Sequence, residues 1–205
     1  MSERGRFVTF EGIDGSGKST HVDTVAATLR ARGVTPLVTR EPGGTPLGES
    51  LRELVLNQPM TRETETMLMF AARAEHLAKV IRPALAAGHW VLCDRFTDAT
   101  YAYQAGGRGM DERAIAELEQ WVHPDLQPGL TILFDVAPEL AAKRLAQARS
   151  ADRFEAEPIA FFGAVRAMYL KRAAANPGRF FIVDGEQDRD AVREQLDHLM
   201  RQWNG

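Results

Sequence analysis

The sequence has little of what disulfide-stabilised or membrane-spanning proteins need. It contains a single cysteine, Cys93, inside an apolar run, so no internal disulfide can form and a reducing compartment is favoured. No apolar run approaches the ~20 residues of a membrane-spanning helix. No signal-peptide core precedes the first apolar segment. We therefore expect a soluble, cytoplasmic protein without a membrane partner.

The sequence also lacks an excess of positive charge. Its 25 lysines and arginines face 28 aspartates and glutamates, which gives a formal net charge of −3. This balance gives no support for nucleic-acid binding, so any attraction for an anionic substrate must come from local clusters. Lysine is scarce, with only Lys18, Lys79, Lys143 and Lys171. The remaining cations are arginines, whose planar fork suits phosphate recognition, although a GC-rich genome gives the same bias.

Length and periodicity predict one α/β domain over residues 1–205. Strand-like apolar runs alternate with amphipathic patterns, as in a three-layer αβα sandwich with a five-stranded parallel sheet. After the run that begins at Phe7, strands are expected at about 34–39, 89–93, 130–136 and 179–183. Helices are expected at about 18–32, 47–56, 66–87, 111–121, 138–148, 161–175 and 188–203, and Pro83 should kink the third of them.

The first apolar run leads into a phosphate-binding loop. Gly12, four variable positions and Gly17-Lys18-Ser19 match the G-x-x-x-x-G-K-[ST] pattern between a strand and a helix. The glycines let backbone N–H groups converge on phosphate oxygens at the positive end of the helix. Lys18 would lie near the β- and γ-phosphates, and Ser19 would ligate Mg²⁺. The expected ATP-binding residues are Gly12, Ile13, Asp14, Gly15, Ser16, Gly17, Lys18, Ser19 and Thr20.

A second candidate metal ligand follows the third predicted strand. Asp94 ends the apolar run 89–93, which is the position of a Walker-B acid that holds Mg²⁺ opposite the loop. Many strands end in aspartate, so this signal is weaker than the loop. ATP and Mg²⁺, the latter at Ser19 and Asp94, are the expected cofactors. The five histidines show no metal-ligand spacing.

Several other segments each allow two interpretations. Residues 40–46 hold two prolines and two glycines at a strand's carboxyl end, and form either a plain turn or a substrate loop. Residues 97–109 offer hydroxyl, amide and phenol groups for a heterocycle, or form a solvated helix and loop. The charged residues at about 146–157 form either a lid that carries cations to a phosphate or a solvated connector. Phe70 and Met69, by spacing alone, suit core packing.

Taken in order, these segments resemble the bacterial thymidylate kinases over essentially the whole chain. They comprise the phosphate loop, Glu-Pro-Gly-Gly-Thr at 41–45, Phe-Ala-Ala-Arg at 70–73, Asp-Arg-Phe at 94–96, Tyr-Gln-x-Gly-Gly-Arg-Gly at 103–109 and Asp-Arg-x-Glu at 152–155. Each later motif is weak alone, but the ordered set is highly specific. The resemblance implies a P-loop NTPase fold, a homodimer, and the reaction of ATP with dTMP to give ADP and dTDP.

The resemblance also implies which residues bind dTMP. Asp14 would accept a hydrogen bond from the 3′-hydroxyl, Arg40 and Arg95 would hold the acceptor phosphate, and Arg73 would reach a thymine carbonyl. The expected dTMP-binding residues are Asp14, Arg40, Glu41, Pro42, Phe70, Arg73, Arg95, Thr100, Tyr103 and Gln104.

Contacts to the base and sugar follow from the same resemblance. Thr100 and Gln104 would border the base, and Tyr103 would pack where a ribose 2′-hydroxyl would sit, which favours deoxyribose. We assign the aromatic ring that stacks on thymine to Phe70. Many family members place this ring four residues before the arginine, where this chain has Met69.

The catalytic arginine is expected in the lid. One branch of the family carries it in the phosphate loop, but here Gly15-Ser16 occupies that region. The usual lid motif Arg-Gly-x-x-Asp-Arg is shortened to residues 149–153, so either Arg149 or Arg153 would contact the γ-phosphate. The expected catalytic residues are Lys18, Arg95, Arg149 and Arg153.

The chemistry implied is phosphoryl transfer to a phosphate oxygen. Its second pKa is about 6, so the acceptor is already ionised near neutral pH and needs no general base. Alternatives are a kinase for dUMP or CMP, an ATPase or nucleotide switch without a small-molecule acceptor, and a non-catalytic binding module. A GTPase is disfavoured because no lysine stands in an Asn-Lys-x-Asp element.

Overall fold

The computed structural model describes residues 5–146 and 153–203, and it is built around a parallel sheet. The strands are β1 (Phe7–Glu11), β2 (Leu37–Arg40), β3 (Val91–Asp94), β4 (Leu130–Asp135) and β5 (Phe180–Asp184). They form one five-stranded sheet in the order β2-β3-β1-β4-β5, with each neighbouring pair parallel. The predicted α/β fold is confirmed. Because β1 is central, the ends of β3 and β4 lie on either side of its carboxyl end.

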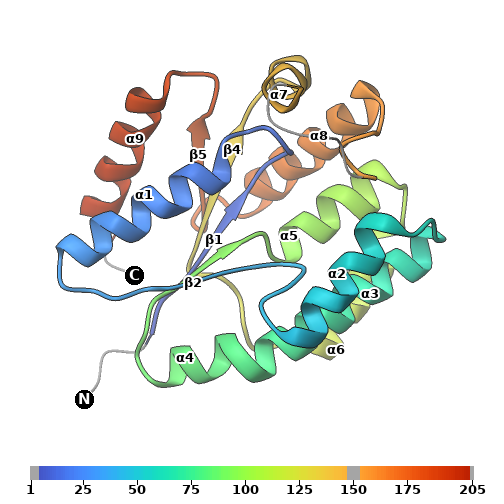
Figure 1. The fold of residues 1–205 in the computed structure, drawn as a ribbon, viewed down its shortest axis with the longest axis horizontal. Coiled ribbons are helices and arrows are strands. Elements are labelled where there is room, and N and C mark those ends of the chain that lie inside the picture. Colours follow the sequence, from blue (N-terminus) through green and yellow to red (C-terminus); the bar gives the residue numbers. More distant parts are fainter. Residues whose placement is uncertain (1–4, 147–152, 204–205) are drawn as a thin grey trace.

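Helices cover both faces of the sheet (Figure 1). On one face, α1 (Lys18–Ala31) packs against α9 (Arg189–Gln202). The other face carries α5 (Thr97–Thr100), the π-helical segment η2 (Tyr101–Gly107) and α8 (Ile159–Ala175). The remaining elements are α2 (Pro46–Asn57), α3 (Arg62–His76), the π-helical segment η1 (Leu77–Ile81), α4 (Arg82–Ala86), α6 (Glu112–Val122) and α7 (Pro138–Leu145).

The sheet is buried on both faces, which explains why its strands are almost continuously apolar. All five residues of β1 are buried. Phe10 stacks on Phe134 with ring centroids 6.5 Å apart, and both belong to the same buried cluster as Val25 and Leu29 of α1. Full burial of each such side chain contributes about 1.5–3 kcal/mol. This core fixes the strand ends that carry the polar residues described below.

The third helix is less regular than its pattern predicts. It begins at Arg62, where the Thr61 hydroxyl accepts a hydrogen bond from the Thr64 N–H at 3.2 Å. Before Pro83 the α-helix gives way to the wider turns of η1. Proline has no N–H and its ring crowds the preceding turn, so the helix changes geometry there. The change of helix type thus lies just before Pro83, where the sequence predicts a kink.

The structure corrects one expected strand and decides between the two interpretations of another segment. The strand expected at 34–39 begins only at Leu37, because Gly33 has a φ of 79° and the Val34 N–H still bonds to the Leu29 carbonyl of α1. The segment 97–109 is helical over 97–107 and largely buried, which excludes a solvated connection. No described helix is both long and apolar enough to span a membrane.

Candidate active site

The phosphate loop lies at the carboxyl end of the central strand. Residues 12–17 connect β1 to α1, between the ends of β3 and β4. Gly12 has a φ of 137°, and a Cβ there would lie 2.6 Å from the Phe134 carbonyl oxygen, so a larger residue requires a shift of backbone. Gly17, with a φ of 90°, immediately precedes α1. Since the first N–H groups of a helix have no intrahelical partner, this junction suits an anion.

Lys18 is the buried cation of this loop. Its Nζ donates to the carbonyl oxygens of Gly12 and Ile13 at 3.0 Å each. Burial, and then the positive charge of Arg95, lower the pKa of Lys18 to about 8, although three nearby carboxylates act in the other direction. A phosphate beside Nζ would raise this pKa again, so the loop favours an anionic ligand.

Ser19 and Asp94 come together as the sequence predicts. Phe10 of β1 pairs with Asp94 at the end of β3, and the Ser19 hydroxyl donates to Asp94 Oδ2 at 3.3 Å. Asp94 Oδ1 is buried and has no hydrogen-bond partner among the described residues. Carboxylate and hydroxyl oxygens are ligands that Mg²⁺ accepts. The unpaired carboxylate oxygen therefore fits a hard divalent cation at this position.

Asp14 joins the phosphate loop to a neighbouring cavity. Its carboxylate accepts hydrogen bonds from Arg95 NH2 and from the Tyr103 hydroxyl, both at 2.7 Å. The same Arg95 nitrogen donates to the Tyr103 oxygen at 2.9 Å. Burial opposes ionisation of Asp14, but Arg95 and Lys18 outweigh it and lower the pKa of Asp14 to about 2. Three predicted site residues thus form one charged cluster.

Arg95 occupies this cluster in a costly backbone conformation. Its φ of 70° lies in the left-handed region, which residues other than glycine rarely adopt. Its NH1 group donates to the Gly12 carbonyl and to the Tyr169 hydroxyl at 3.0 Å each. These contacts hold the turn after β3. As a result, Asp94 lies beside Ser19, whereas the adjacent Arg95 lies beside Asp14 and Tyr103.

A cavity opens beside Asp14 and Arg95 at the same end of the sheet. Its walls come from the 40–46 loop, α2, α3, the turn after β3, α5, η2 and the segment after residue 152. Of the predicted dTMP-binding residues, the cavity brings together Asp14, Glu41, Pro42, Arg73, Arg95, Thr100, Tyr103 and Gln104.

Arg73 is the most constrained cation of the cavity wall. Only 3% of its side chain is exposed, and it donates from Nε to Glu41 at 2.7 Å and from NH2 to the Thr100 hydroxyl at 3.0 Å. Its NH1 group is buried without a hydrogen-bond partner in the described part of the chain. An unpaired buried N–H costs about 1–3 kcal/mol, more when charged. This donor therefore suits a ligand that offers an acceptor.

Behind Arg73, a buried group resembles a metal site in composition. One ligand atom each from Glu41, His76 and Cys93 lies within 4.8 Å of the others. However, Glu41 is bonded to both Arg73 and His76, and the other His76 nitrogen lies 2.7 Å from the Thr39 hydroxyl. The thiol of Cys93 donates to a backbone carbonyl. These atoms already have partners, so the group works as a hydrogen-bonded support for Arg73.

The structure separates Phe70 from the cavity. Phe70 is buried behind the wall, where its ring stacks on His123 at 6.5 Å and lies against the Arg73 guanidinium at 4.8 Å. The described residues that line the cavity include Met69 and not Phe70. A one-residue step turns a helical side chain by about 100°, so only one of the neighbours can face the ligand. The assignment of the stacking ring to Phe70 therefore lacks support in this geometry.

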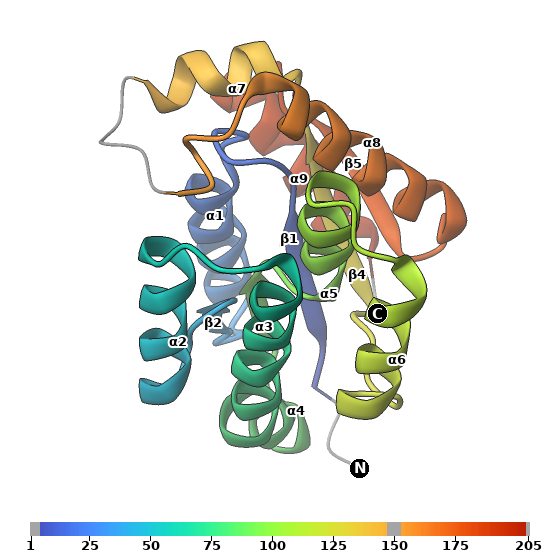
Figure 2. The ribbon, with the colours of Figure 1, turned by 90° about the vertical axis from the view of Figure 1, so that its right-hand side faces the viewer.

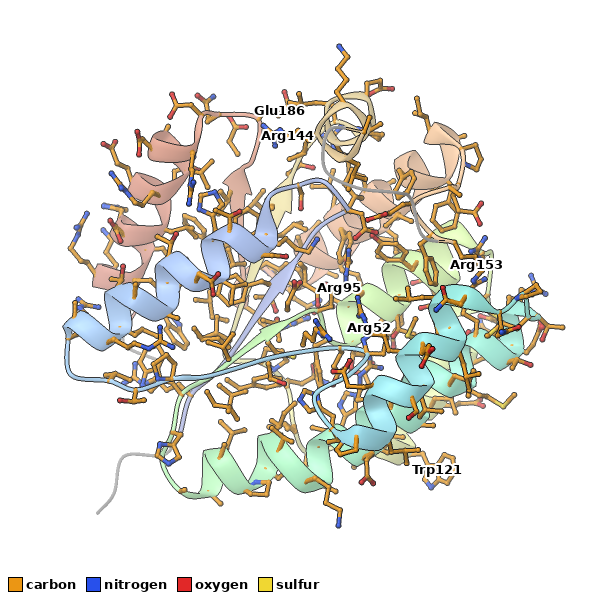
Figure 3. All side chains as sticks on the ribbon, viewed as in Figure 1. Arg52, Arg95, Trp121, Arg144, Arg153 and Glu186 are labelled. Atoms are coloured by element: carbon orange, nitrogen blue, oxygen red, sulfur yellow. The ribbon has the colours of Figure 1, made fainter. Side chains whose placement is uncertain are left out.

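Two arginines near the phosphate end differ in position. Arg40 lines the space around the phosphate loop, is 54% exposed, and pairs with Glu49 at 2.8 Å. Arg52, on α2, lines both that space and the cavity beside Asp14, and Figure 3 places it near Arg95 in the middle of the molecule. Sequence reasoning missed Arg52. The one sequence feature that could have indicated Arg52 is the presence of an arginine on the helix after the 40–46 loop.

The expected lid arginines have different outcomes. Arg149 lies outside the described residues. Arg153 binds the Val55 carbonyl at 2.9 Å and the Glu65 carboxylate at 2.6 Å, instead of facing the phosphate loop. The neighbouring Phe154 lies edge-on to Tyr103 and lines the cavity. Of the described residues of this expected lid, Phe154 thus lines the cavity that holds Arg73 and Gln104, and Glu155 lines the space around the phosphate loop.

Comparison with known proteins identifies the family. The family model described as thymidylate kinase matches residues 10–196. The chain belongs to the thymidylate kinase family. It is 58% identical to a thymidylate kinase of Bordetella pertussis over 202 residues, covering 98% of this chain and 97% of that protein. It is 56% identical to a thymidylate kinase of Methylobacillus flagellatus over 200 residues, covering 98% of each.

A solved structure supports the same assignment. The crystal structure of thymidylate kinase from Ehrlichia chaffeensis superposes with a TM-score of 0.76 at 33% identity, covering 96% of this chain and 99% of that one. Membership of the thymidylate kinase family makes this chain a nucleotide-using kinase. The predicted fold, family and enzyme class are thereby confirmed.

Proposed function

We propose that this protein transfers the γ-phosphoryl group of ATP to dTMP, giving ADP and dTDP. The observation that carries the proposal is the continuity of the two sites. Asp14 belongs to the phosphate loop, yet it also lines the neighbouring cavity and pairs there with Arg95. A nucleoside monophosphate in the cavity would have its phosphate near Arg95 and Arg52, which line both spaces.

Charge neutralisation and positioning would do the chemical work. The reacting phosphates are both anionic and must approach to about 3–3.5 Å. Lys18 would move from the loop carbonyls to the β- and γ-phosphates, and Arg95 would hold the acceptor phosphate. Charges placed in advance at the site cost no reorganisation during the reaction. Because the acceptor oxygen is largely ionised near neutral pH, no side chain needs to remove a proton.

A divalent cation belongs to this proposal. Ser19 and Asp94 would hold Mg²⁺, directly or through water, and the unpaired Asp94 Oδ1 is the observation that supports the site. The ion would supply positive charge to the transferring phosphate. Ser19 and Asp94 line the space around the phosphate loop, so this charge would lie on the ATP side of the site.

The cavity suits a pyrimidine 2′-deoxynucleotide. Asp14 offers a carboxylate oxygen to a 3′-hydroxyl, and Tyr103 occupies the wall next to it. Met69, Thr100 and Gln104 border the place proposed for the base. Apolar contact from Met69 would replace the aromatic stacking that we expected from Phe70.

A substrate panel tests the proposal. ADP release would be measured with ATP and Mg²⁺ in the presence of dTMP, dUMP, CMP, GMP, AMP or no acceptor. We expect activity mainly with dTMP. Equal release without an acceptor would identify an ATPase or a nucleotide switch and overturn the acceptor site, while equal use of CMP would overturn the assignment of the base.

We further propose a homodimer formed through the α2–α3–α6 face. Figure 2 shows these helices side by side on one side of the molecule. Their exposed apolar residues are Leu47 (53%), Leu54 (46%), Met67 (56%) and Trp121 (82%). Light scattering after size exclusion should give the mass of a dimer, and Trp121→Glu should shift it toward a monomer; a monomeric wild type would contradict the proposal. A cytoplasmic location stays a prediction from the sequence.

A further inference from the structure

Glu65 is a buried carboxylate that the catalytic scheme above leaves unused. It lies in the first turn of α3 and only 1% of the residue is exposed. An acid at this position normally favours the helix start from the surface. Here the carboxylate turns inward, where Gln104 Nε2 donates to it at 2.8 Å and Arg153 donates at 2.6 Å. Burying a carboxylate is costly, so its partners point to a specific task.

The first consequence concerns the orientation of the Gln104 side-chain amide. An amide has one donating and one accepting end, and either end can face a neutral polar neighbour. Glu65 forms ion pairs with Arg153 and, at 3.5 Å, with Arg108, and a carboxylate paired in this way only accepts hydrogen bonds. The amide nitrogen must therefore face Glu65. The amide oxygen is then turned away from Glu65, and Gln104 lines the cavity.

The second consequence concerns the base that the cavity recognises. Arg73 NH1 is a buried, unpaired donor in the same cavity wall, and a guanidinium never accepts. Together with the Gln104 oxygen, it presents one donor and one acceptor. A 4-oxopyrimidine offers the matching pair, an acceptor at O4 and a donor at N3–H. A 4-aminopyrimidine offers a donor at N4 and an acceptor at N3, so it opposes both groups.

We propose that Glu65 is a positioning residue that fixes the Gln104 amide and thereby makes the acceptor site selective for 4-oxopyrimidines over 4-aminopyrimidines. This inference rests on the proposed function. Arg73 disfavours the 4-amino group on its own, because a guanidinium can only donate hydrogen bonds. Gln104 can reverse by a simple flip, and Glu65 is the group that prevents the flip. Without this carboxylate, the Gln104 amide could flip and donate a hydrogen bond to the N3 acceptor of a 4-aminopyrimidine.

The decisive variant is Glu65→Gln, which keeps the size of the side chain but gives it a reversible amide. kcat/KM would be measured for dTMP, dUMP and dCMP with saturating ATP. We expect the dTMP/dCMP ratio to fall by about 10-fold or more, since unpaired polar groups in a binding site discriminate on this scale. The dTMP/dUMP ratio should not change, because both bases carry O4 and N3–H. The KM for ATP should also stay constant.

The matched control is Glu157→Gln. Glu157 pairs with Arg108 in the same cluster and, within residues 5–146 and 153–203, makes no hydrogen bond to Gln104, so this variant removes a neighbouring charge and leaves the contact between Glu65 and Gln104 in place. This variant should keep the wild-type dTMP/dCMP ratio. A second test combines Glu65→Gln with Gln104→Leu. If Glu65 acts through Gln104, adding Glu65→Gln to Gln104→Leu should leave the ratio unchanged.

The outcomes separate this inference from the proposed function. A wild type that does not phosphorylate dTMP overturns the function itself. A wild type that does so, with an unchanged dTMP/dCMP ratio in Glu65→Gln, overturns only the role of Glu65. If the dTMP/dCMP ratio falls equally in the Glu157→Gln control, the effect comes from the proposed lid in general, and the role of Glu65 is refuted. If Glu65→Gln does not fold, Glu65→Ala, which leaves room for water, provides the same ratio.

Discussion

The two halves of the proposed active site are built in different ways. The phosphate half is a nearly continuous segment, residues 12–20, with Asp94 added from the adjacent strand β3. The proposed acceptor half collects side chains from the 40–46 loop, α2, α3, α5 and η2, together with Phe154. The phosphate half relies on backbone geometry and one lysine. The acceptor half relies on side chains that hold one another in place.

The difference shows in how each half treats its charges. Lys18 bonds to the carbonyl oxygens of its own loop, and a ligand would take over these bonds. Arg73 is instead held by Glu41 and Thr100, and His76 in turn holds Glu41. The phosphate half is therefore ready to rearrange around an anion. The acceptor half is organised before the ligand arrives, which favours specificity.

The comparison predicts the largest effect at the phosphate half. Lys18→Ala should lower kcat by at least about 10²–10³-fold, because it removes a charge aimed at the transferring phosphate. The loss should be the same with dTMP and dUMP, since neither base is near Lys18. Steady-state ADP release measures it. Lys143→Ala, at an exposed position of α7, is the matched control and should keep wild-type activity. An unchanged kcat in Lys18→Ala would refute this role.

A smaller and more selective effect is expected at the acceptor half. Arg73→Lys keeps the charge but cannot donate to Glu41, Thr100 and a base at once. The kcat/KM for dTMP should fall about 10–100-fold, as a charged hydrogen bond is worth about 1.5–3 kcal/mol. Kinetics with dTMP and ATP varied in turn measure the change.

The KM for ATP separates the two halves in this experiment. It should stay constant in Arg73→Lys, whereas a parallel loss of ATP binding would show that the halves are not independent. Arg82→Lys is the matched control. Arg82 is 40% exposed and pairs with Asp125 at the surface, so the same exchange should be neutral there.

The same contrast explains what the sequence could and could not reveal. The phosphate loop and the positions of Ser19 and Asp94 follow from local patterns, because a contiguous motif and a strand end determine them. The acceptor residues were found only through resemblance to a family. Arg52 and Glu65 were missed, since an arginine or glutamate on an amphipathic helix usually marks a solvated face. Their burial and partners depend on long-range packing.

The placement of Phe70 and Arg153 illustrates the same limit. Both lie within a residue or two of positions that do line the cavity, Met69 and Phe154. A motif identifies the helix or loop that contributes to a site. It does not decide which of two neighbours faces the ligand, because this depends on the exact rotation of the element. Elements were thus predicted more reliably than side-chain directions.

Glu11 supports both halves of the proposed site, and we expect its replacement to have the smallest effect on turnover. Glu11 ends β1 next to Gly12, and its carboxylate accepts hydrogen bonds from the Phe96 N–H at 2.7 Å and the Tyr169 hydroxyl at 2.8 Å. Burial, and then the negative charge of Asp98, raise the pKa of Glu11 from 4.5 to about 8. The folded protein therefore keeps a proton on Glu11 at neutral pH.

The pH dependence of stability tests this state. Below pH 4.5, Glu11 is protonated in both folded and unfolded chains. Between 4.5 and about 8, only the folded chain holds the proton, so its stability falls as pH rises, by at most about 1.4 kcal/mol per pH unit. The Glu11→Gln variant has no ionisable group at this position, so its stability should not fall in this way. In urea unfolding, the free energy of unfolding of Glu11→Gln should rise relative to that of the wild type from pH 5 to pH 8. For the exposed control Glu53→Gln, the difference in unfolding free energy from the wild type should stay constant over this range. A flat difference for Glu11→Gln would mean that Glu11 is ionised in the fold, and that the halves are joined by a buried anion instead of a neutral acid.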